Sequence, residues 1–293
     1  MNSWYLRNIQ NLCNWTGIMC NEGGVVSKIS LPNSSLSGTL TYFQFSSFPN
    51  LTHFDLNNNH VGCVSPSEIG RLTHLRYLDL NNNNLNGAIP VQISNLQKVW
   101  YLNLGGNYLT DPNWSDFTSM PALTSLSLYS NELKNEFPEE DLGLLPNLEV
   151  IQLFENSFER RIPSSIGQLQ HLRYLDLHSN QLNSSIPYEL GFCSNLTFLA
   201  LAGNSLSGEL PMSLSILIRI TDLGIAEKRP VTDLVERSRR KGDGRLCGGG
   251  SCGGEWRRQW WCPVVIIVVD ERNGFQGLKK KNSVYMCRYF YIW

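Results

Sequence analysis

The sequence predicts an α/β solenoid, a curved right-handed superhelix with a parallel β-sheet on its concave face and irregular or 3-10 turns on its convex face. The pattern L-x-x-L-x-L-x-x-N-x-L recurs with a period of 24 residues, or 25 at one step. Two of its leucines alternate with polar residues, which is typical of a short strand with one buried face. A unit this small cannot bury its apolar side alone, so the units must stack. Seven complete copies begin at Leu51, Leu75, Val99, Leu123, Leu148, Leu172 and Leu196.

An asparagine column is the second periodic feature. An amide carries two donors and an acceptor, so it can satisfy backbone groups where the chain turns at the end of a strand. We therefore expect a ladder of structural asparagines, one in each turn. Its members are Asn59, Asn83, Asn107, Asn131, Asn156, Asn180 and Asn204.

Composition divides the chain into three parts. Residues 1–24 form a partial N-terminal cap, residues 25–227 hold about nine repeats with a degenerate first and last unit, and residues 228–293 form a non-repeat tail. Through residue 227 there are 10 Lys and Arg against 19 Asp and Glu, whereas the tail has 14 against 6. We expect this basic tail to be disordered. Its tryptophans raise nucleic-acid or membrane-surface binding as an alternative role, which the tail's lack of periodic amphipathicity disfavours.

A second motif follows the asparagines and centres on Ile-Pro or Leu-Pro pairs, as in LNGAIPVQISNL from Leu85. Proline fixes an extended segment followed by a turn. With the 24-residue period, the motif resembles the plant-type leucine-rich repeats of receptor-like kinases, receptor-like proteins and polygalacturonase-inhibitor proteins. The resemblance implies a protein- or peptide-binding module similar to the extracellular ligand-sensing part of a plant receptor-like kinase. The alternative is a secreted inhibitor of a cell-wall-degrading enzyme, similar to polygalacturonase-inhibitor proteins.

The N-terminal segment CNWTGIMC, from Cys13 to Cys20, is similar to the C-x-W-x-G-[VI]-x-C segment that caps the first repeat in these families. The resemblance implies a Cys13–Cys20 disulfide, and two free thiols beside Trp15 are the alternative. It also implies a location in the apoplast or on the extracellular face of the plasma membrane, although the chain shows no signal peptide or transmembrane helix. Glycosylation sequons begin at Asn14, Asn33, Asn50, Asn113, Asn183 and Asn195.

Outward-pointing residues of stacked strands form the concave surface on which solenoids bind partners. Aromatic residues recur there, and such residues are favoured at interaction centres. Aspartates at a neighbouring repeated position, Asp55, Asp79 and Asp176, are expected to be solvated. The alternative is that tyrosine is common in such repeats whatever the ligand. The predicted ligand-binding patch consists of Tyr77, Tyr101, Tyr129, Phe154, Tyr174 and His178.

Catalytic, metal and cofactor chemistry is not expected. Asp222-Leu223-Gly224 resembles the magnesium-binding segment of protein kinases. However, Ile220, Leu223 and Ile225 fall on the leucine positions of a last repeat, and no other kinase motif precedes them. The histidines and cysteines lack metal-ligand spacing. The sequence thus predicts a non-enzymatic protein that binds a protein or peptide ligand and a co-receptor, without nucleic acid or a membrane span. A kinase domain is expected in full-length relatives but not in this chain.

Overall fold

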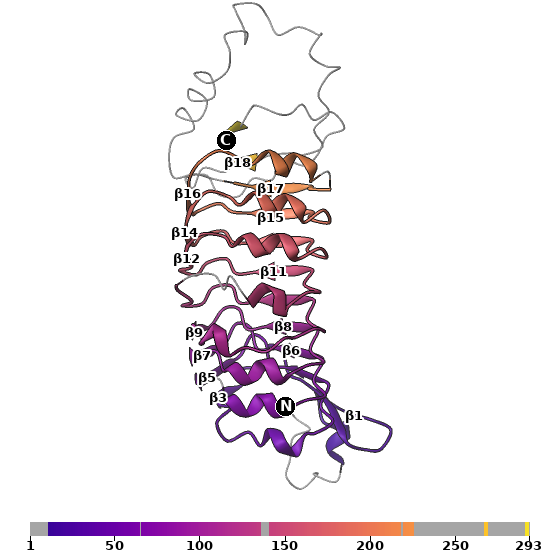
Figure 1. Ribbon diagram of the computed structural model, residues 1–293. Helices are drawn as coiled ribbons and strands as arrows, with labels where there is room; N and C mark the ends of the chain where they lie inside the picture. Colours follow the sequence, from indigo (N-terminus) through magenta and orange to yellow (C-terminus); the bar gives the residue numbers. More distant parts are fainter. Residues whose placement is uncertain are drawn as a thin grey trace, which may run out of the picture.

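The computed structural model describes residues 11–64, 66–135, 141–217 and 219–225, together with two short strands at 267–268 and 291–292. Apart from those strands, the expected disorder of the tail concerns residues outside the described ranges. The described chain winds into a solenoid of stacked coils (Figure 1), so the predicted fold class is confirmed.

One long sheet runs along the solenoid. Its first two strands are antiparallel and all later neighbours are parallel. Through β17 the parallel strands pair residues one repeat apart, for example Tyr77 with Tyr101. In spatial order the strands are β1 (Ile18–Cys20), β2 (Val26–Ser30), β4 (His53–Asp55), β6 (Tyr77–Asp79), β8 (Tyr101–Asn103), β10 (Ser125–Ser127), β11 (Val150–Gln152), β13 (Tyr174–Asp176), β15 (Phe198–Ala200), β17 (Asp222–Gly224), β18 (Ile267–Val268) and β19 (Tyr291–Ile292).

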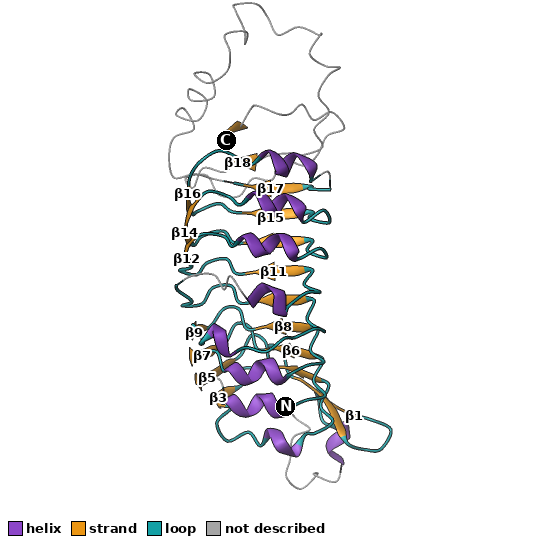
Figure 2. Ribbon diagram, viewed as in Figure 1, coloured by secondary structure: helices purple, strands orange, loops and turns teal. Residues whose placement is uncertain are grey.

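Short 3-10 helices form a separate row along the solenoid (Figure 2). Five of them start directly after a proline in extended conformation, because proline holds the backbone that leads into the turn. The helices are η2 (Phe45–Ser47), η3 (Ser67–Arg71), η4 (Val91–Asn95), η5 (Trp114–Asp116), η6 (Asp141–Leu144), η7 (Ser164–Gln168), η8 (Tyr188–Phe192) and η9 (Met212–Ile216).

A second row of parallel strands follows the asparagines, where the sequence predicts only extended backbone. Within two groups of coils, the extended segment of one coil lies beside its equivalent in the next coil, and the two form backbone hydrogen bonds. One sheet contains β3 (Ser37–Thr39), β5 (His60–Val64), β7 (Asn84–Ala88) and β9 (Tyr108–Thr110); another contains β12 (Glu159–Arg160), β14 (Gln181–Ser184) and β16 (Ser205–Leu206).

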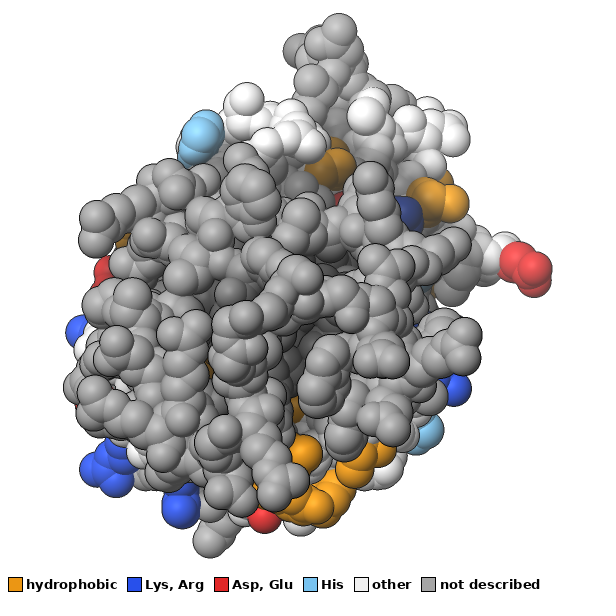
Figure 3. All heavy atoms as spheres, turned by 90° about the horizontal axis from the view of Figure 1, so that it is seen from above, with side chains coloured by type: hydrophobic (Ala, Val, Ile, Leu, Met, Phe, Trp, Pro, Cys, Tyr) orange, Lys and Arg blue, Asp and Glu red, His pale blue; other side chains and the backbone are white. Residues whose placement is uncertain are grey.

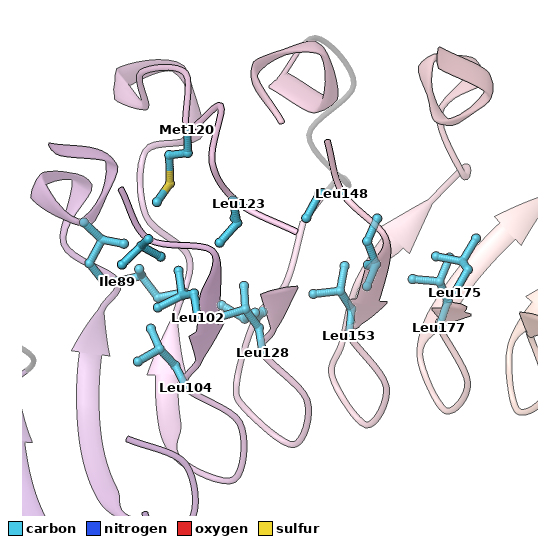
Figure 4. Packing of buried hydrophobic residues seen from close by; sticks show 14 of the residues in the cluster. Ile89, Leu102, Leu104, Met120, Leu123, Leu128, Leu148, Leu153, Leu175 and Leu177 are labelled. Carbon is cyan, nitrogen blue, oxygen red and sulfur yellow. The ribbon is translucent and has the colours of Figure 1, made fainter. Parts of the chain in front are cut away.

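Leucine and isoleucine side chains fill the interior and touch those of the next coil. Leu102, Leu128, Leu153 and Leu175 come from successive coils and point into the same space (Figure 4). All four are at most 4% exposed. Because each buried side chain of this size contributes about 1.5–3 kcal/mol, the continuous core is the main source of stability.

Each asparagine of the ladder joins two coils. The Nδ2 of Asn107 donates to the carbonyl oxygens of Leu104 in its own coil and Leu80 in the preceding coil, both at 3.0 Å. Its Oδ1 accepts the backbone N–H of Leu85 at 3.0 Å. The other six asparagines make the same set of bonds. All are buried except Asn131 and Asn156, which are half-buried.

The N-terminal cap covers the first parallel strand. Strand β1 pairs antiparallel with β2, and Ile18 packs against the core. Cys13 and Cys20 form a disulfide with their Cα atoms 5.5 Å apart, so the free-thiol alternative does not hold. The cap thus shields the apolar edge that the first coil would otherwise expose.

The segment resembling a kinase motif is a solenoid strand. Strand β17 pairs in parallel with β15, so that Leu223 lies beside Leu199. Ile220, Leu223 and Ile225 are buried in the core, as the repeat register predicts. Within the described ranges, none of the helices is both long and apolar enough to span a bilayer.

Candidate ligand-binding face

The outer surface of the long sheet, which we call the sheet face, carries the predicted binding residues. Two columns of side chains matter here. The first column is the residue that opens each strand, and it includes Tyr77, Tyr101 and Tyr174. The second column lies two residues beyond each strand, and it includes Tyr129, Phe154 and His178. The structure divides the predicted patch into three separate aromatic stacks.

The first stack is formed by His53, Tyr77 and Tyr101. The rings of Tyr77 and Tyr101 are nearly parallel with centroids 4.4 Å apart, and His53 lies 5.9 Å from Tyr77 on the other side. Trp100 meets both tyrosine rings edge-on. Burial lowers the pKa of His53, and the charges of Lys28 and Arg76 act in the same direction. His53 therefore joins the stack as a neutral ring near neutral pH.

Asp79 lies beneath this stack and is 3% exposed, which corrects the expectation of a solvated aspartate. Its Oδ2 accepts hydrogen bonds from the hydroxyls of Tyr77 at 3.2 Å and Tyr101 at 3.4 Å. Its Oδ1 accepts from the backbone N–H of Asn81 at 3.1 Å and from its Nδ2 at 2.8 Å. Burial raises the pKa of Asp79 despite these bonds. Burial next to this carboxylate also raises the pKa of Tyr77, which keeps the phenol protonated.

Asp176 repeats this arrangement four coils further on, and it is also buried rather than solvated. Its Oδ1 lies 2.6 Å from Nδ1 of His178, and its Oδ2 accepts from the hydroxyl of Tyr174 at 3.4 Å. Asp55 is only half-buried, where it accepts from Ser30 Oγ at 3.0 Å and Asn57 Nδ2 at 2.7 Å. Asp79 and Asp176 thus hold the aromatic side chains above them in place, whereas Asp55 bonds to no aromatic residue in the described part of the chain.

The second stack consists of Tyr129, Phe154 and His178. Neighbouring ring centroids are 4.7 and 4.6 Å apart, with planes within 9° of parallel. Gly105 makes room for the stack, because a Cβ there would lie 2.4 Å from Cε1 of Tyr129. Burial raises the pKa of Tyr129, and the charge of Asp79 adds to the shift. The Tyr129 ring thus lies against Gly105 of the preceding coil.

The third stack pairs Tyr174 with Phe198, whose ring centroids are 4.0 Å apart. Between the first and third stacks, the first column carries only Ser125 and Val150. We call this stretch the small-residue interval. Three strand spacings of about 4.8 Å separate Tyr101 from Tyr174. Phe198 and His53 occupy first-column positions that the repeat alignment identifies, but the predicted patch omits both.

The six predicted glycosylation residues differ in exposure. Asn14, Asn33, Asn50, Asn113 and Asn183 are exposed. Asn195 is half-buried, and its side chain accepts a hydrogen bond from Arg219 at 2.8 Å and donates one to the carbonyl oxygen of Gln170 at 2.8 Å. A glycan attached to Nδ2 needs open space around the amide, and Asn195 is the one half-buried acceptor among the six, so we expect it to be the least favourable.

Comparisons with known proteins agree with this architecture. Two family models described as leucine-rich repeats match residues 49–98 and 146–206. Among Arabidopsis thaliana proteins, MDIS1-interacting receptor like kinase 2 is 38% identical over 68 residues, and LRR receptor-like serine/threonine-protein kinase RGI3 is 37% identical over 71 residues. These alignments cover 22% and 24% of this chain and 6% of each kinase.

Solved structures extend the likeness to most of the chain. The ectodomain of the Arabidopsis thaliana receptor kinase GASSHO1/SCHENGEN3, in complex with CASPARIAN STRIP INTEGRITY FACTOR 2, superposes with a TM-score of 0.71 and 33% identity. That match covers 76% of this chain and 26% of the ectodomain. The ectodomain of the Arabidopsis receptor kinase HAESA, with an IDA peptide hormone ligand, gives 0.66 and 30%, covering 72% of this chain and 36% of that chain.

The stacked coils, the asparagine ladder and these matches define the class: the chain has the fold of a leucine-rich-repeat solenoid. Its repeats are similar to those of the ectodomains of plant leucine-rich-repeat receptor-like kinases, so the predicted resemblance is confirmed. The matched structures are ectodomains, the non-enzymatic part of such receptors. The chain spans only a small part of the length of these relatives.

Proposed function

We propose that the protein is a recognition module that binds a peptide or a protein segment along the sheet face, outside the cell. The preorganised aromatic surface carries this proposal. Tyr77 and Tyr101 are fixed by the buried carboxylate of Asp79, so their side-chain entropy is already lost before a ligand arrives. Two of the structurally similar ectodomains have peptide or protein-factor ligands in their complexes. A co-receptor is part of a third such complex, that of HAESA with IDA and SERK1.

The small-residue interval indicates which side chain the ligand offers. Ser125 and Val150 have small side chains, so the first column leaves space between the rings of Tyr101 and Tyr174. The rings of Tyr129 and Phe154 lie beside this space, in the second column. An apolar ligand side chain placed here would contact aromatic rings on several sides. Gln152 is half-buried in β11, the strand of Val150, and offers an amide to the ligand backbone. We therefore expect an extended peptide with an apolar anchor residue.

Selection from a random-peptide phage library tests the proposal. The full chain is immobilised, enriched peptides are synthesised, and their dissociation constants are measured by calorimetry. Tyr129→Ala with Phe154→Ala should weaken binding at least about tenfold, because aromatic anchors dominate interface energy. Tyr42→Ala with Tyr108→Ala is the matched control, since both tyrosines are exposed and lie outside the long sheet. The control should bind as the wild type does.

Gly105→Ala tests whether binding depends on where the Tyr129 ring lies, because this variant keeps the ring but moves it. The new Cβ would displace the Tyr129 ring while the rest of the stack remains, so affinity should fall with little change in melting temperature. Enriched peptides that bind the Tyr129→Ala, Phe154→Ala variant as tightly as the wild type would refute the proposal. Failure to enrich any peptide with a dissociation constant below about 100 µM would refute it as well.

A further inference from the structure

Four large apolar side chains are exposed on the last two 3-10 helices. Tyr188 and Phe192 of η8 are 54% and 46% exposed, and Met212 and Ile216 of η9 are 81% and 58% exposed. The two helices are neighbours, and Tyr188 contacts Phe192 edge-on with centroids 5.5 Å apart. In the end-on view, hydrophobic side chains gather on part of the rim, at the lower edge (Figure 3). We call these four residues the helix-face patch.

The repeat register shows that this patch is specific to the last two coils. The four residues stand one and five positions after the proline that precedes each helix. The same two positions are exposed and polar in η3 and η7, with Ser67 and Arg71 in one and Ser164 and Gln168 in the other. In η4 they are Val91, which is half-buried, and Asn95. The fold itself therefore does not require apolar residues there.

Neighbouring coils do not cover the half of the patch that lies on η8. Helix η8 is packed between η7 and η9, yet its two aromatic residues remain about half exposed. A further coil would stack along the solenoid axis beyond η9 and would leave the outer surface of η8 as it is. Contiguous apolar surface of this kind marks an interaction site in soluble proteins. The partner must approach from outside the solenoid.

We infer that the helix-face patch binds the same patch of a second copy of the chain. The aromatic pair lies on one helix and the aliphatic and thioether pair lies on the next. A two-fold axis that runs between η8 and η9, parallel to the helices, places Tyr188 against Met212 and Phe192 against Ile216 of the other copy. Contacts between methionine sulfur and aromatic rings are favourable, and a two-fold interface is the commonest closed arrangement.

Area and charge are consistent with a weak dimer. The exposed part of each patch side chain amounts to roughly 100–150 Å², so two patches bury roughly 1,000 Å², at the low end of specific interfaces. Glu189 is the one charged residue in η8 and η9, so two facing patches repel each other little. We expect a dissociation constant in the micromolar range.

Sedimentation velocity of the full chain between about 1 and 100 µM tests the inference. The wild type should show a concentration-dependent monomer–dimer equilibrium. Tyr188→Ser with Phe192→Gln introduces the residues that η7 carries at these positions, and it should raise the dissociation constant at least tenfold. Met212→Ser with Ile216→Gln should do the same. Tyr42→Ser with Tyr108→Ser, which removes two exposed tyrosines elsewhere, should leave the dimer unchanged.

Mixing the two patch variants tests the two-fold pairing. The intact aliphatic pair of one variant can meet the intact aromatic pair of the other, so the mixture should recover part of the association that each variant loses alone. A wild type that stays monomeric at 100 µM would overturn the inference. Association that survives in both patch variants, through any other surface of the chain, would overturn it too, and a mixture without recovery would overturn the proposed pairing.

Discussion

At the scale of single residues, the asparagine ladder shows why one amide recurs in every coil. Each inner turn leaves two carbonyl groups and one N–H facing the interior, and one planar amide satisfies all three. Leucine could fill the same volume, but it would leave those backbone groups buried without partners. This requirement is local and is repeated in every unit. For that reason the positions of the ladder could be read directly from the sequence.

Substitutions along the ladder should show that an asparagine contributes more to the unfolding free energy where it is more deeply buried. Asn107→Ala leaves the carbonyl oxygens of Leu80 and Leu104 without their amide partner in a site closed to water, and we expect a loss of about 2–3 kcal/mol in unfolding free energy. Asn131→Ala removes the same bonds from a half-buried site where water can replace them, so its loss should be about 1 kcal/mol. Urea unfolding followed by circular dichroism measures both. Equal losses would contradict this explanation.

Asp79 shows what a repeat pattern cannot predict. The pattern correctly places Asp55, Asp79 and Asp176 at outward positions of the strands. Whether an outward carboxylate meets water depends on the residues beside it in neighbouring coils. Tyr77 and Tyr101 cover Asp79, and the pattern assigns no direction to their side chains. The aromatic candidates could therefore be identified from the sequence, whereas their division into three stacks on buried aspartates could not.

The raised pKa of Asp79 predicts a pH dependence of stability. Burial lifts this pKa above its ordinary value of 3.8, so the folded state holds the proton more tightly than the unfolded state. The contribution of Asp79 to wild-type stability should therefore fall as the pH rises from 3.8 through the higher folded-state pKa. Asp79→Asn removes this titration and can keep the hydrogen bonds with Asn81. The stability of this variant relative to the wild type should be lowest at about pH 3 and should increase toward about pH 7.

Thermal unfolding measured across that range checks the direction of this change. Asp116→Asn is the matched control, because Asp116 is an exposed aspartate on η5. If the difference between Asp79→Asn and the wild type stays constant with pH, or runs the other way, Asp79 does not titrate as its burial implies.

At the scale of elements, the predicted strands and turns reflect signals that lie within one repeat. Alternating leucines mark the strands of the long sheet, and prolines mark the start of the helices η3, η4, η7, η8 and η9. The second row of strands has no such signal, because it arises from hydrogen bonds between coils. A strand such as β7, with the sequence NLNGA, contains little that favours a strand on its own.

The irregular middle of the solenoid also shows that signals within one repeat do not predict how neighbouring coils pair. The segment Asp111-Pro112-Asn113-Trp114 departs from the usual motif, and the second row of strands changes from one sheet to another between β9 and β12. The step from Asn131 to Asn156 is 25 residues instead of 24. The long sheet nevertheless continues through β10 and β11 without a break in register. Irregular sequence thus alters the outer turns of a coil and leaves its strand intact, because the strand is fixed by buried leucines on both sides.

At the scale of the whole molecule, stability should be close to a sum of terms from single coils and from the interfaces between neighbouring coils. The main contacts between elements join neighbouring coils, such as β4 with β6 and β13 with β15. In such an array each coil depends on the interfaces at its two ends. The proposed binding surface around β10 and β11 lies several coils from the N-terminal cap. Damage to the cap should therefore remain close to it.

Removal of the cap disulfide tests this expectation. Cys13→Ser with Cys20→Ser releases a short loop, which should cost about 2–3 kcal/mol at the N-terminal end by the loop-closure argument. Amide hydrogen exchange should speed up in β1 and β2, and to a lesser extent in β4, since β2 would lose its antiparallel neighbour. Exchange in β13 and β15 should stay at the wild-type rate. Cys63→Ser, which removes an exposed free thiol, is the control. Faster exchange throughout the array would show that the coils unfold as one unit, and the sheet face would then depend on the cap for its stability.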